Sequence, residues 1–378
     1  MGSMATEPTP GNQPATLTID VDAIAANYRS VTERMGAGAT AAVVKADAYG
    51  LGVAHVAGPL WAAGCREYFV ARPAEGVALR ELLPAATIYV FDGVTPGSAP
   101  EFVHHGLVPV INSLTQLERW RDQARSLGRS LPTALHVDTG MLRLGLDDGE
   151  FATLIDRGDL LDGLTIDVVA SHLASADEAG SDQPERQLER FRGLRQMLPV
   201  GRASLANSSG VFRHKAFHFD LARPGYALYG GHPQPDSGPN PMLPVVTLEA
   251  PVIQLRPGRP GETVGYGASV CLERPSLLAT VAVGYADGFL RSGSGRSHVA
   301  VNGHPAPIVG RISMDLITID VTDLPADAVT EGTPVEVIGP HRTIDEVASD
   351  AGTIGYEVLT SLGGRYRRRY LGSSSDDA

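Results

Sequence analysis

Short apolar runs rich in β-branched residues recur through the first 225 residues and alternate with segments of helical spacing. Two helical segments are clearest, at 113–127, where Ser113 is a plausible N-cap, and at 187–198. Strands that alternate with helices predict a parallel sheet, and eight such units in about 200 residues predict a (β/α)8 barrel. The expected strands are 41–44, 67–70, 87–91, 107–111, 134–137, 166–170, 203–206 and 219–222.

An open, doubly wound parallel sheet is the alternative arrangement of such units. Its nucleotide-binding forms carry a Gly-x-Gly-x-x-Gly after the first strand, or a phosphate loop that ends in Gly-Lys-Ser/Thr. Neither motif is present here, which favours the barrel.

The composition changes after Gly230. Residues 231–244 are dense in Pro, Gly and Asn and read as a linker, and strand-like runs with turn signals such as Asn302-Gly303 dominate beyond it. We therefore expect the barrel over 15–242 and a mostly β C-terminal domain over 243–370, which the early strand 15–19 is a candidate to join. Residues 1–14 read as a tag remnant with a flexible N-terminus, and 371–378 as a disordered tail.

Charge and composition limit the class of protein. The net charge of −12 opposes nucleic-acid binding, and the short basic run 365–370 is better explained as a solvated or interface-forming edge. Cys65 and Cys271 give neither a disulfide framework nor metal-ligand spacing. No apolar run approaches the ~18 residues that span a bilayer, and no secretory signal is seen. We expect a cytoplasmic protein that binds neither membrane nor metal.

Polar residues follow several of the expected strands, where a barrel builds its active site. Lys45 follows the first strand, Asp138 and Arg143 the fifth and His172 the sixth. The last two loops, which commonly bind phosphate in such barrels, offer the following residues: Asn207, Ser208, Arg223 and Gly225. A lysine aimed at a rim with a phosphate site indicates a Schiff-base enzyme with an anionic ligand.

The segment around this lysine, Val-Val-Lys-Ala-Asp-Ala-Tyr-Gly at 43–50, resembles the cofactor-lysine signature of the alanine racemase family. Further matches keep the family order and extend the resemblance over roughly residues 17–365. They lie at 138–145, 171–174, 206–208, 222–230, 264–267, 283–288, 310–315 and 355–357.

The resemblance implies a barrel with a β-rich C-terminal domain, assembled as a head-to-tail homodimer. It implies that L-alanine and D-alanine are interconverted by two-base proton transfer on a pyridoxal-phosphate aldimine of Lys45, which supplies D-alanine for peptidoglycan. A broad-specificity racemase of the same fold is the nearest alternative. An amino-acid decarboxylase on this fold and a non-catalytic pyridoxal-phosphate carrier are more distant ones.

The same resemblance implies roles for individual residues. Arg223 would face the pyridine nitrogen. Arg143 would bond to the cofactor phenol oxygen and steer the substrate carboxylate, which would also meet the backbone amide of Met314 from the partner subunit. His172 would pack beside the ring and bond to Tyr285 of the partner subunit. The phosphate would be held by Tyr49, Asn207, Ser208, Gly225, Tyr226 and Tyr356.

Racemisation removes a proton from one face of Cα and returns one to the other, so it is served by two bases. Lys45 and Tyr285 would serve opposite faces, and each has an ordinary pKa near 10 that cations and burial must bring toward working pH. Arg223 cannot accept a proton, so the pyridine nitrogen should stay neutral, which favours racemisation over transamination.

The chain departs from the common family pattern at a few positions. His136 stands where many relatives have a carbamylated lysine that orients the nearby arginine, so an anion, a water or the imidazole itself is left to support Arg143. Leu51 replaces a common histidine, and Gly363-Gly364 departs from a Pro-Arg pattern. These departures bear on how the activity is tuned and on which amino acids the protein accepts as substrates.

Overall fold

The computed structural model describes residues 15–198, 200–325 and 327–372. The flexible N-terminus expected over 1–14, and residues 373–378 of the expected tail, lie outside the described residues. The chain divides into two units, Val21–Leu243 and a second unit made of residues 15–20 with those from Pro244 onward. Each unit is described by itself.

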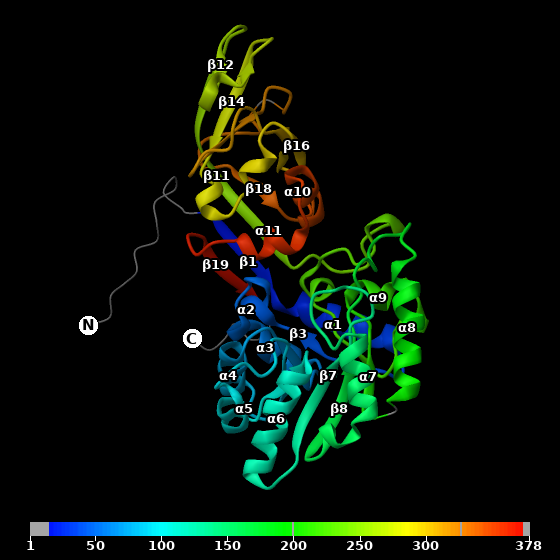
Figure 1. Ribbon diagram of the computed structural model, residues 1–378. Helices are drawn as coiled ribbons and strands as arrows, with labels where there is room; N and C mark the ends of the chain where they lie inside the picture. The colour runs from blue at the N-terminus through cyan, green and yellow to red at the C-terminus, as the bar shows by residue number, and fades with distance from the viewer. Residues whose placement is uncertain (1–14, 199, 326, 373–378) are drawn as a thin grey trace, which may run out of the picture. The chain divides into compact units, whose positions relative to one another are not determined.

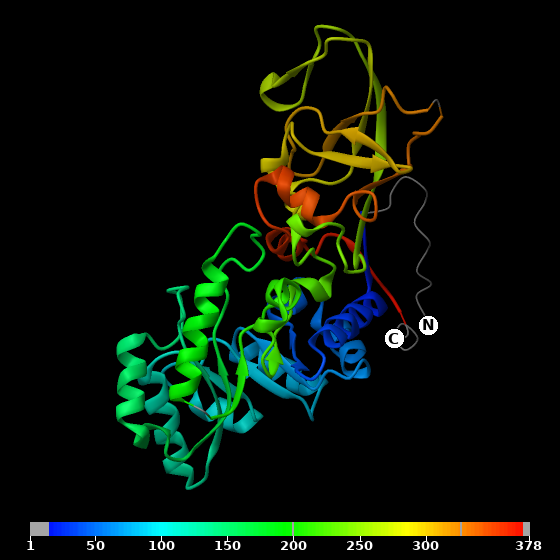
Figure 2. The same ribbon diagram turned by 90° about the vertical axis from the view of Figure 1, so that its right-hand side faces the viewer.

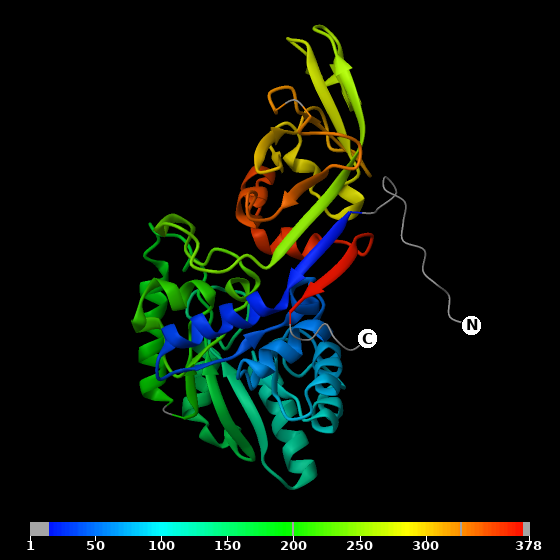
Figure 3. The ribbon, with the colours of Figure 1, turned by 180° about the vertical axis from the view of Figure 1, so that it is seen from behind.

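The first unit is a ring of parallel strands with helices around it (Figures 1 and 3). Backbone hydrogen bonds from Val43 N to Pro224 O (2.9 Å) and from Arg223 N to Ala206 O (2.9 Å) join its first and last strands to their neighbours and confirm the predicted (β/α)8 barrel. The strands are β2 (Ala39–Thr40) with β3 (Ala42–Val43), β4 (Glu67–Val70), β5 (Thr87–Val90), β6 (Val108–Ile111), β7 (Leu131–His136), β8 (Leu164–Ala170), β9 (Arg202–Ser204) and β10 (Leu221–Ala222).

The helices of this unit begin and end where the local sequence dictates. Ser113 caps α6 by accepting a hydrogen bond from Gln116 N at 3.3 Å, as predicted, and Gly128 ends the helix at φ 61°. The helix expected at 187–198 begins earlier, at Gln183, because Pro184 fits a first turn that the apolar periodicity does not mark. The helices are α1 (Val21–Met35), α3 (Val53–Ala62), α4 (Pro73–Leu82), α5 (Ala99–His105), α6 (Leu114–Leu127), α7 (Asp148–Asp156), α8 (Gln183–Met197) and α9 (Ser208–Arg213).

The second unit is mostly β, as predicted. Its long strand β11 pairs with three others at once, and Asn302 (φ 50°) with Gly303 (φ 79°) forms the two-residue turn of a hairpin. Figure 2 shows this sheet from the side. The strands are β1 (Thr16–Asp20), β11 (Val246–Gly258), β12 (Thr263–Val264), β13 (Val270–Cys271), β14 (Ser276–Val281), β15 (His298–Val301), β16 (His304–Pro307), β17 (Ile317–Asp320), β18 (Pro334–Ile338) and β19 (Arg367–Leu371); the helices are α10 (Ile344–Ala351) and α11 (Gly355–Ser361).

Two expected boundaries need correction. The start of the barrel at residue 15 is wrong, and the alternative that strand 15–19 joins the β domain is confirmed, because β1 pairs with β11 on one side and with β19 on the other (Figure 3). The loose tail expected from residue 371 begins one residue too early, since Leu371 pairs with Asp20 at the end of the same ladder. Residues 367–370 of the basic run lie in the edge strand β19, and Arg365, just before the strand, donates to Asp315 at 2.8 Å.

Candidate active site

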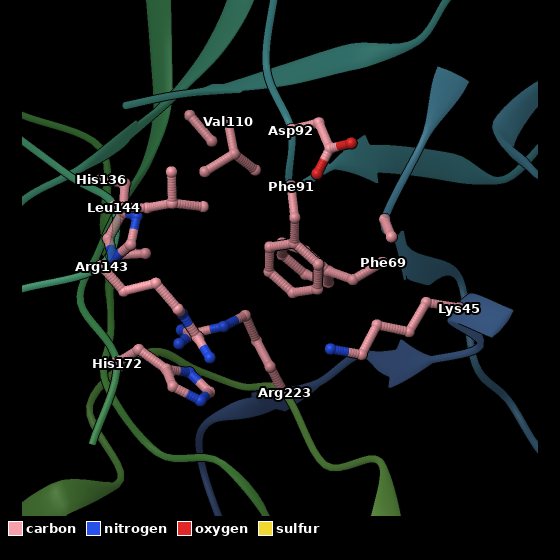
Figure 4. Close-up of a pocket in the computed structure, with 13 residues that line it drawn as sticks. Lys45, Phe69, Phe91, Asp92, Val110, His136, Arg143, Leu144, His172 and Arg223 are labelled. Atoms are coloured by element: carbon pink, nitrogen blue, oxygen red, sulfur yellow. The ribbon is translucent and has the colours of Figure 1, made fainter. Parts of the chain in front are cut away.

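A cavity of about 160 Å³ lies inside the barrel at the carboxyl ends of its strands. Lys45, Arg143 and Arg223 point into it from different loops (Figure 4), and Asp92 is the one carboxylate among the described residues that line it. The other labelled side chains of its wall are Phe69, Phe91, Val110, His136, Leu144 and His172. The structure thus brings together four residues that the sequence selected separately, and it leaves a concentration of cationic groups that suits an anionic ligand.

The chain takes a left-handed turn directly after Lys45. Residues Ala46 to Tyr49 have φ values between 53° and 58°, a conformation that costs roughly 1–2 kcal/mol per residue. Carboxylates offset this cost: Glu75 Oε1 accepts the N–H of Ala46 at 2.7 Å, and Asp47 Oδ1 accepts that of Val53 at 2.7 Å. Backbone strain held in this way is typical of functional sites. The sequence does not reveal the turn, because alanine has no preference for it.

Lys45 is a buried amine beside a fixed cation. Burial lowers its pKa from the ordinary value, and the positive charge of Arg143 lowers it further. The Nζ atom lies 5.7 Å from the centre of the Phe91 ring. Burial and the charge of Arg143 both favour the neutral amine, the form that attacks a carbonyl carbon or accepts a proton.

Removing the charge of Arg143 should therefore raise the pKa of Lys45. In Arg143→Gln the ammonium form should persist to higher pH, so the midpoint for acylation of Lys45 by an amine reagent should move upward. Peptide mass spectrometry of cofactor-free protein measures this directly. The chain has only one other lysine, the exposed Lys215, which serves as an internal reference. Arg143→Lys keeps the charge and should leave the midpoint in place; an equal midpoint in Arg143→Gln would contradict the electrostatic argument.

Arg223 is a buried guanidinium with an unsatisfied donor. It is 4% exposed, donates to Ser204 Oγ, and donates through Nη2 to the Ser171 carbonyl at 2.6 Å. Its Nε is buried and has no partner among the described residues. Burial lowers the pKa of Arg223 to about 10, which still leaves it charged at neutral pH. A buried N–H without a partner is costly, so the site suits a ligand that brings an acceptor.

The two histidines of the cavity are both held neutral. Burial and then the charge of Arg223 lower the pKa of His172 well below its ordinary value, and the same causes lower that of His136 to about 4. The Nδ1 atom of His136 lies 2.7 Å from Asn112 Oδ1. Since the Asn112 amide nitrogen donates to Phe91 O and Val110 O, its oxygen must be the acceptor, and His136 carries its proton on Nδ1.

This arrangement bears on what supports Arg143. Among the described residues Arg143 makes no hydrogen bond or ion pair, with His136 or with any other residue. Its loop is fixed instead through the backbone, because the Asp138 carboxylate accepts the N–H groups of Gly140 (2.8 Å), Met141 (2.8 Å) and Leu142 (2.9 Å). The guanidinium is thus presented to the cavity on a braced loop and is available to bind an anion.

A second group of predicted residues meets at the loops after β9 and β10. Ser208 Oγ accepts the N–H groups of Gly225 and Ala227, both at 3.1 Å. A Cβ on Gly225 would overlap the Tyr49 hydroxyl, so glycine is needed for this close approach. Asn207 caps α9 by accepting the Gly210 N–H at 2.9 Å, and Tyr226 is buried beside them. Small residues, hydroxyls and backbone N–H groups in such a cluster suit a phosphate.

The remaining predicted residues belong to the β unit. Tyr285 is 40% exposed and Met314 is 53% exposed, so both side chains are open to contact from outside the β unit. Their backbones are tied together, since Tyr285 N bonds Ser313 O at 3.1 Å and Ala286 N bonds Met314 O at 2.9 Å. Tyr356 lies in α11. An exposed tyrosine and methionine on a fixed turn are typical of a surface that contacts another molecule.

The sequence patterns do not select several residues that line the cavity or that hold its lining side chains in place. Phe69 and Phe91 lie at the ends of β4 and β5, and the rule that selected Lys45 would have selected them had it considered apolar residues as well. Asn112 follows β6 in the same way. Ser171 and Ser204, which hold Arg223, carry no sequence signal, because their role depends on a side chain from another loop.

Comparison with known proteins covers both units. Family models described as "Alanine racemase, N-terminal domain" and "Alanine racemase, C-terminal domain" match residues 19–233 and 245–370. An alanine racemase of Methylobacterium nodulans is 50% identical over 362 residues, 96% of this chain and 97% of that protein. The crystal structure of alanine racemase from Bartonella henselae with covalently bound pyridoxal phosphate is 42% identical with a TM-score of 0.91, and covers 95% of this chain and 99% of that one. The biosynthetic alanine racemase from Pseudomonas aeruginosa is 36% identical with a TM-score of 0.89, and covers 95% and 100%.

Proposed function

The chain belongs to the alanine racemase family, and we propose from this and from its cavity that it interconverts L-alanine and D-alanine with pyridoxal phosphate bound to Lys45. The observation that carries the proposal is the placement of Lys45, the only lysine at the cavity, opposite two guanidinium groups. One amine for the cofactor aldehyde and cations for its anionic groups and for a substrate carboxylate are what this reaction requires.

The residues present fit pyridoxal phosphate. The unsatisfied Nε of Arg223 calls for an acceptor, and the lack of a side chain at Gly225 lets the Tyr49 hydroxyl lie against its backbone, beside Ser208. Phe69 and Phe91 give the cavity an apolar wall for a ring. We assign the phosphate to Tyr49, Asn207, Ser208, Gly225, Tyr226 and Tyr356. When bound, the cofactor supplies the electron-withdrawing group that makes the α-proton of alanine acidic.

The chain's own residues hold the substrate and move the proton. Arg143 holds the substrate carboxylate, since its guanidinium has no other partner among the described residues. The amine of Lys45, whose pKa burial and Arg143 lower, takes or returns the proton on one face of Cα. Tyr285 of the partner subunit serves the other face through its hydroxyl oxygen. His172, kept neutral by burial, accepts a hydrogen bond from that hydroxyl.

The second base requires a second copy of the chain. We propose a head-to-tail homodimer in which the exposed Tyr285 and Met314 of each β unit contact the partner's barrel. An arrangement of this kind closes with two equivalent sites. The reaction would take place in the cytoplasm, where D-alanine would enter peptidoglycan synthesis. None of the helices in the described part of the chain is long and apolar enough to cross a membrane.

Chiral analysis of products over a panel of L-amino acids tests the proposal. Alanine should racemise fastest, and in deuterium oxide both enantiomers should gain deuterium at Cα. Comparable rates with larger amino acids would indicate a broad-specificity racemase instead of an alanine racemase. Release of carbon dioxide without racemisation would refute both racemase assignments in favour of a decarboxylase.

Arg223 should suppress transamination by leaving the pyridine nitrogen of the cofactor unprotonated. A guanidinium cannot accept a hydrogen bond from a protonated pyridine nitrogen, whereas a carboxylate in its place can stabilise the protonated form. In Arg223→Glu the ratio of transamination to racemisation should therefore rise by about tenfold or more, the equivalent of ~1.4 kcal/mol between the two barriers. Pyruvate formation and enantiomer interconversion measure the ratio. Retained cofactor absorbance checks that the variant still binds, and an unchanged ratio in a loaded variant contradicts the argument.

A further inference from the structure

A fully buried glutamine on α8, Gln187, joins loops that carry the polar side chains of the cavity. Gln187 is 0% exposed and does not line the cavity itself. Its Oε1 accepts the N–H of Ala174 at 2.9 Å, and its Nε2 donates to His172 O at 2.8 Å and to Thr139 Oγ1 at 3.2 Å. Both donors of the amide and its oxygen are used, so the orientation of the side chain is fixed.

These contacts continue toward Arg223. Thr139 Oγ1 accepts from Gln187 and also shares a hydrogen bond of 2.7 Å with Ser171 Oγ. The carbonyl of Ser171 in turn accepts a hydrogen bond from Arg223 Nη2 at 2.6 Å. The loop after β8 is thus held around His172 by one side chain, and the same side chain reaches the residue that anchors Arg223.

A second glutamine one turn earlier on α8 touches only one of these loops. Gln183 Nε2 donates to Gly140 O at 2.9 Å, within the loop that carries Arg143. Residues four apart lie on the same face of a helix, so Gln183 and Gln187 face the barrel together. The two residues form a natural pair for comparison, because only Gln187 also holds the loop of His172.

Anchoring the helix does not require this amide. Leu188, Phe191 and Leu194 are already buried on α8, and a fully buried amide is costly unless all its hydrogen bonds are made. We propose that Gln187 is a positioning residue for racemisation, which sets the places of His172 and Arg143 at the cavity without touching substrate or cofactor. The inference rests on the proposed function, since it assigns Gln187 a part in that reaction.

Gln187→Met tests the proposal, because methionine fills a similar volume and makes none of the three hydrogen bonds. We expect kcat for alanine to fall by about 10- to 100-fold, the scale of misplacing a reacting group by about 1 Å, and KM to rise as well. Gln183→Met should raise KM with little change in kcat, because it loosens only the loop of Arg143. Gln196→Met, at an exposed site on the same helix, should change neither constant.

Two further measurements separate positioning from loss of fold. The amount of cofactor bound per chain should be unchanged in Gln187→Met, because Lys45 and Ser208 lie on other loops, and the Ala174 amide should exchange its hydrogen faster. If Gln187→Met does not fold, Thr139→Val removes one link and should change kcat and KM in the same direction. Wild-type kcat and KM in a folded Gln187→Met would overturn the proposal. A wild-type protein inactive on alanine would instead refute the proposed function, with the Ala174 exchange rate still reporting on the contacts.

Discussion

Lys45→Ala should lower racemisation of alanine by about 10²–10⁴-fold from the lost proton transfer alone, and by more because the variant also lacks the covalent link to the cofactor. Lys45 is the only amine among the described residues that line the cavity, and burial together with Arg143 lowers its pKa. The two histidines of the cavity cannot replace Lys45 as the base. His136 is held by its hydrogen bond to Asn112, and burial holds the pKa of His172 well below its ordinary value. Enantiomer interconversion by purified variant and wild type measures the loss.

The lysine content of the chain makes the assignment unusually direct to check. Lys45 and Lys215 are its only lysines, so borohydride reduction of the loaded protein can fix the cofactor to no more than two side chains. We expect the added mass on the peptide that contains Lys45. Lys215→Arg, at an exposed position, should retain both the modification and full activity. Cofactor fixed to Lys215 in the wild type would overturn the assignment of Lys45.

Strand periodicity and the position of residues at strand ends were enough to predict the barrel and much of its cavity. Lys45, Arg143, His172 and Arg223 each follow a strand, and parallel strands bring such residues to one end. This geometric rule depends only on where the strands end and not on the contacts of each side chain. It therefore predicts which loops carry the cavity residues without knowledge of those contacts.

Contacts between distant loops could not be predicted in this way. The tautomer of His136 depends on Asn112, 24 residues away, and the place of Gln187 depends on hydrogen bonds to two loops, those that follow β7 and β8. The left-handed turn after Lys45 is stabilised by Glu75 from α4 as well as by its own Asp47, and the first of these contacts cannot be read from the local sequence. Strand 15–19 has the same alternation whichever sheet it joins, and only pairing with β11 and β19 decides between them.

Tyr285→Phe should also be nearly inactive, with a loss of about 10²–10⁴-fold, because it removes only the hydroxyl that serves as the second base. The turn that carries Tyr285 should survive the change, since it is held by the backbone bond to Ser313 and by Asp287, whose carboxylate accepts the Gly284 N–H at 2.9 Å. Thermal unfolding should therefore match that of the wild type. A variant with wild-type rates in both directions would remove Tyr285 from the mechanism.

Mixing the two inactive variants tests whether the bases come from different subunits. In a head-to-tail dimer of Lys45→Ala with Tyr285→Phe, one site carries both lesions and the other carries neither. Free exchange of equal amounts makes half of the dimers mixed, with one working site of two, so about one quarter of the wild-type activity should return. Mixing either variant with itself returns none. If tagged subunits exchange and activity stays absent, both bases belong to one chain, and Tyr285 reaches Lys45 by the folding of a single subunit.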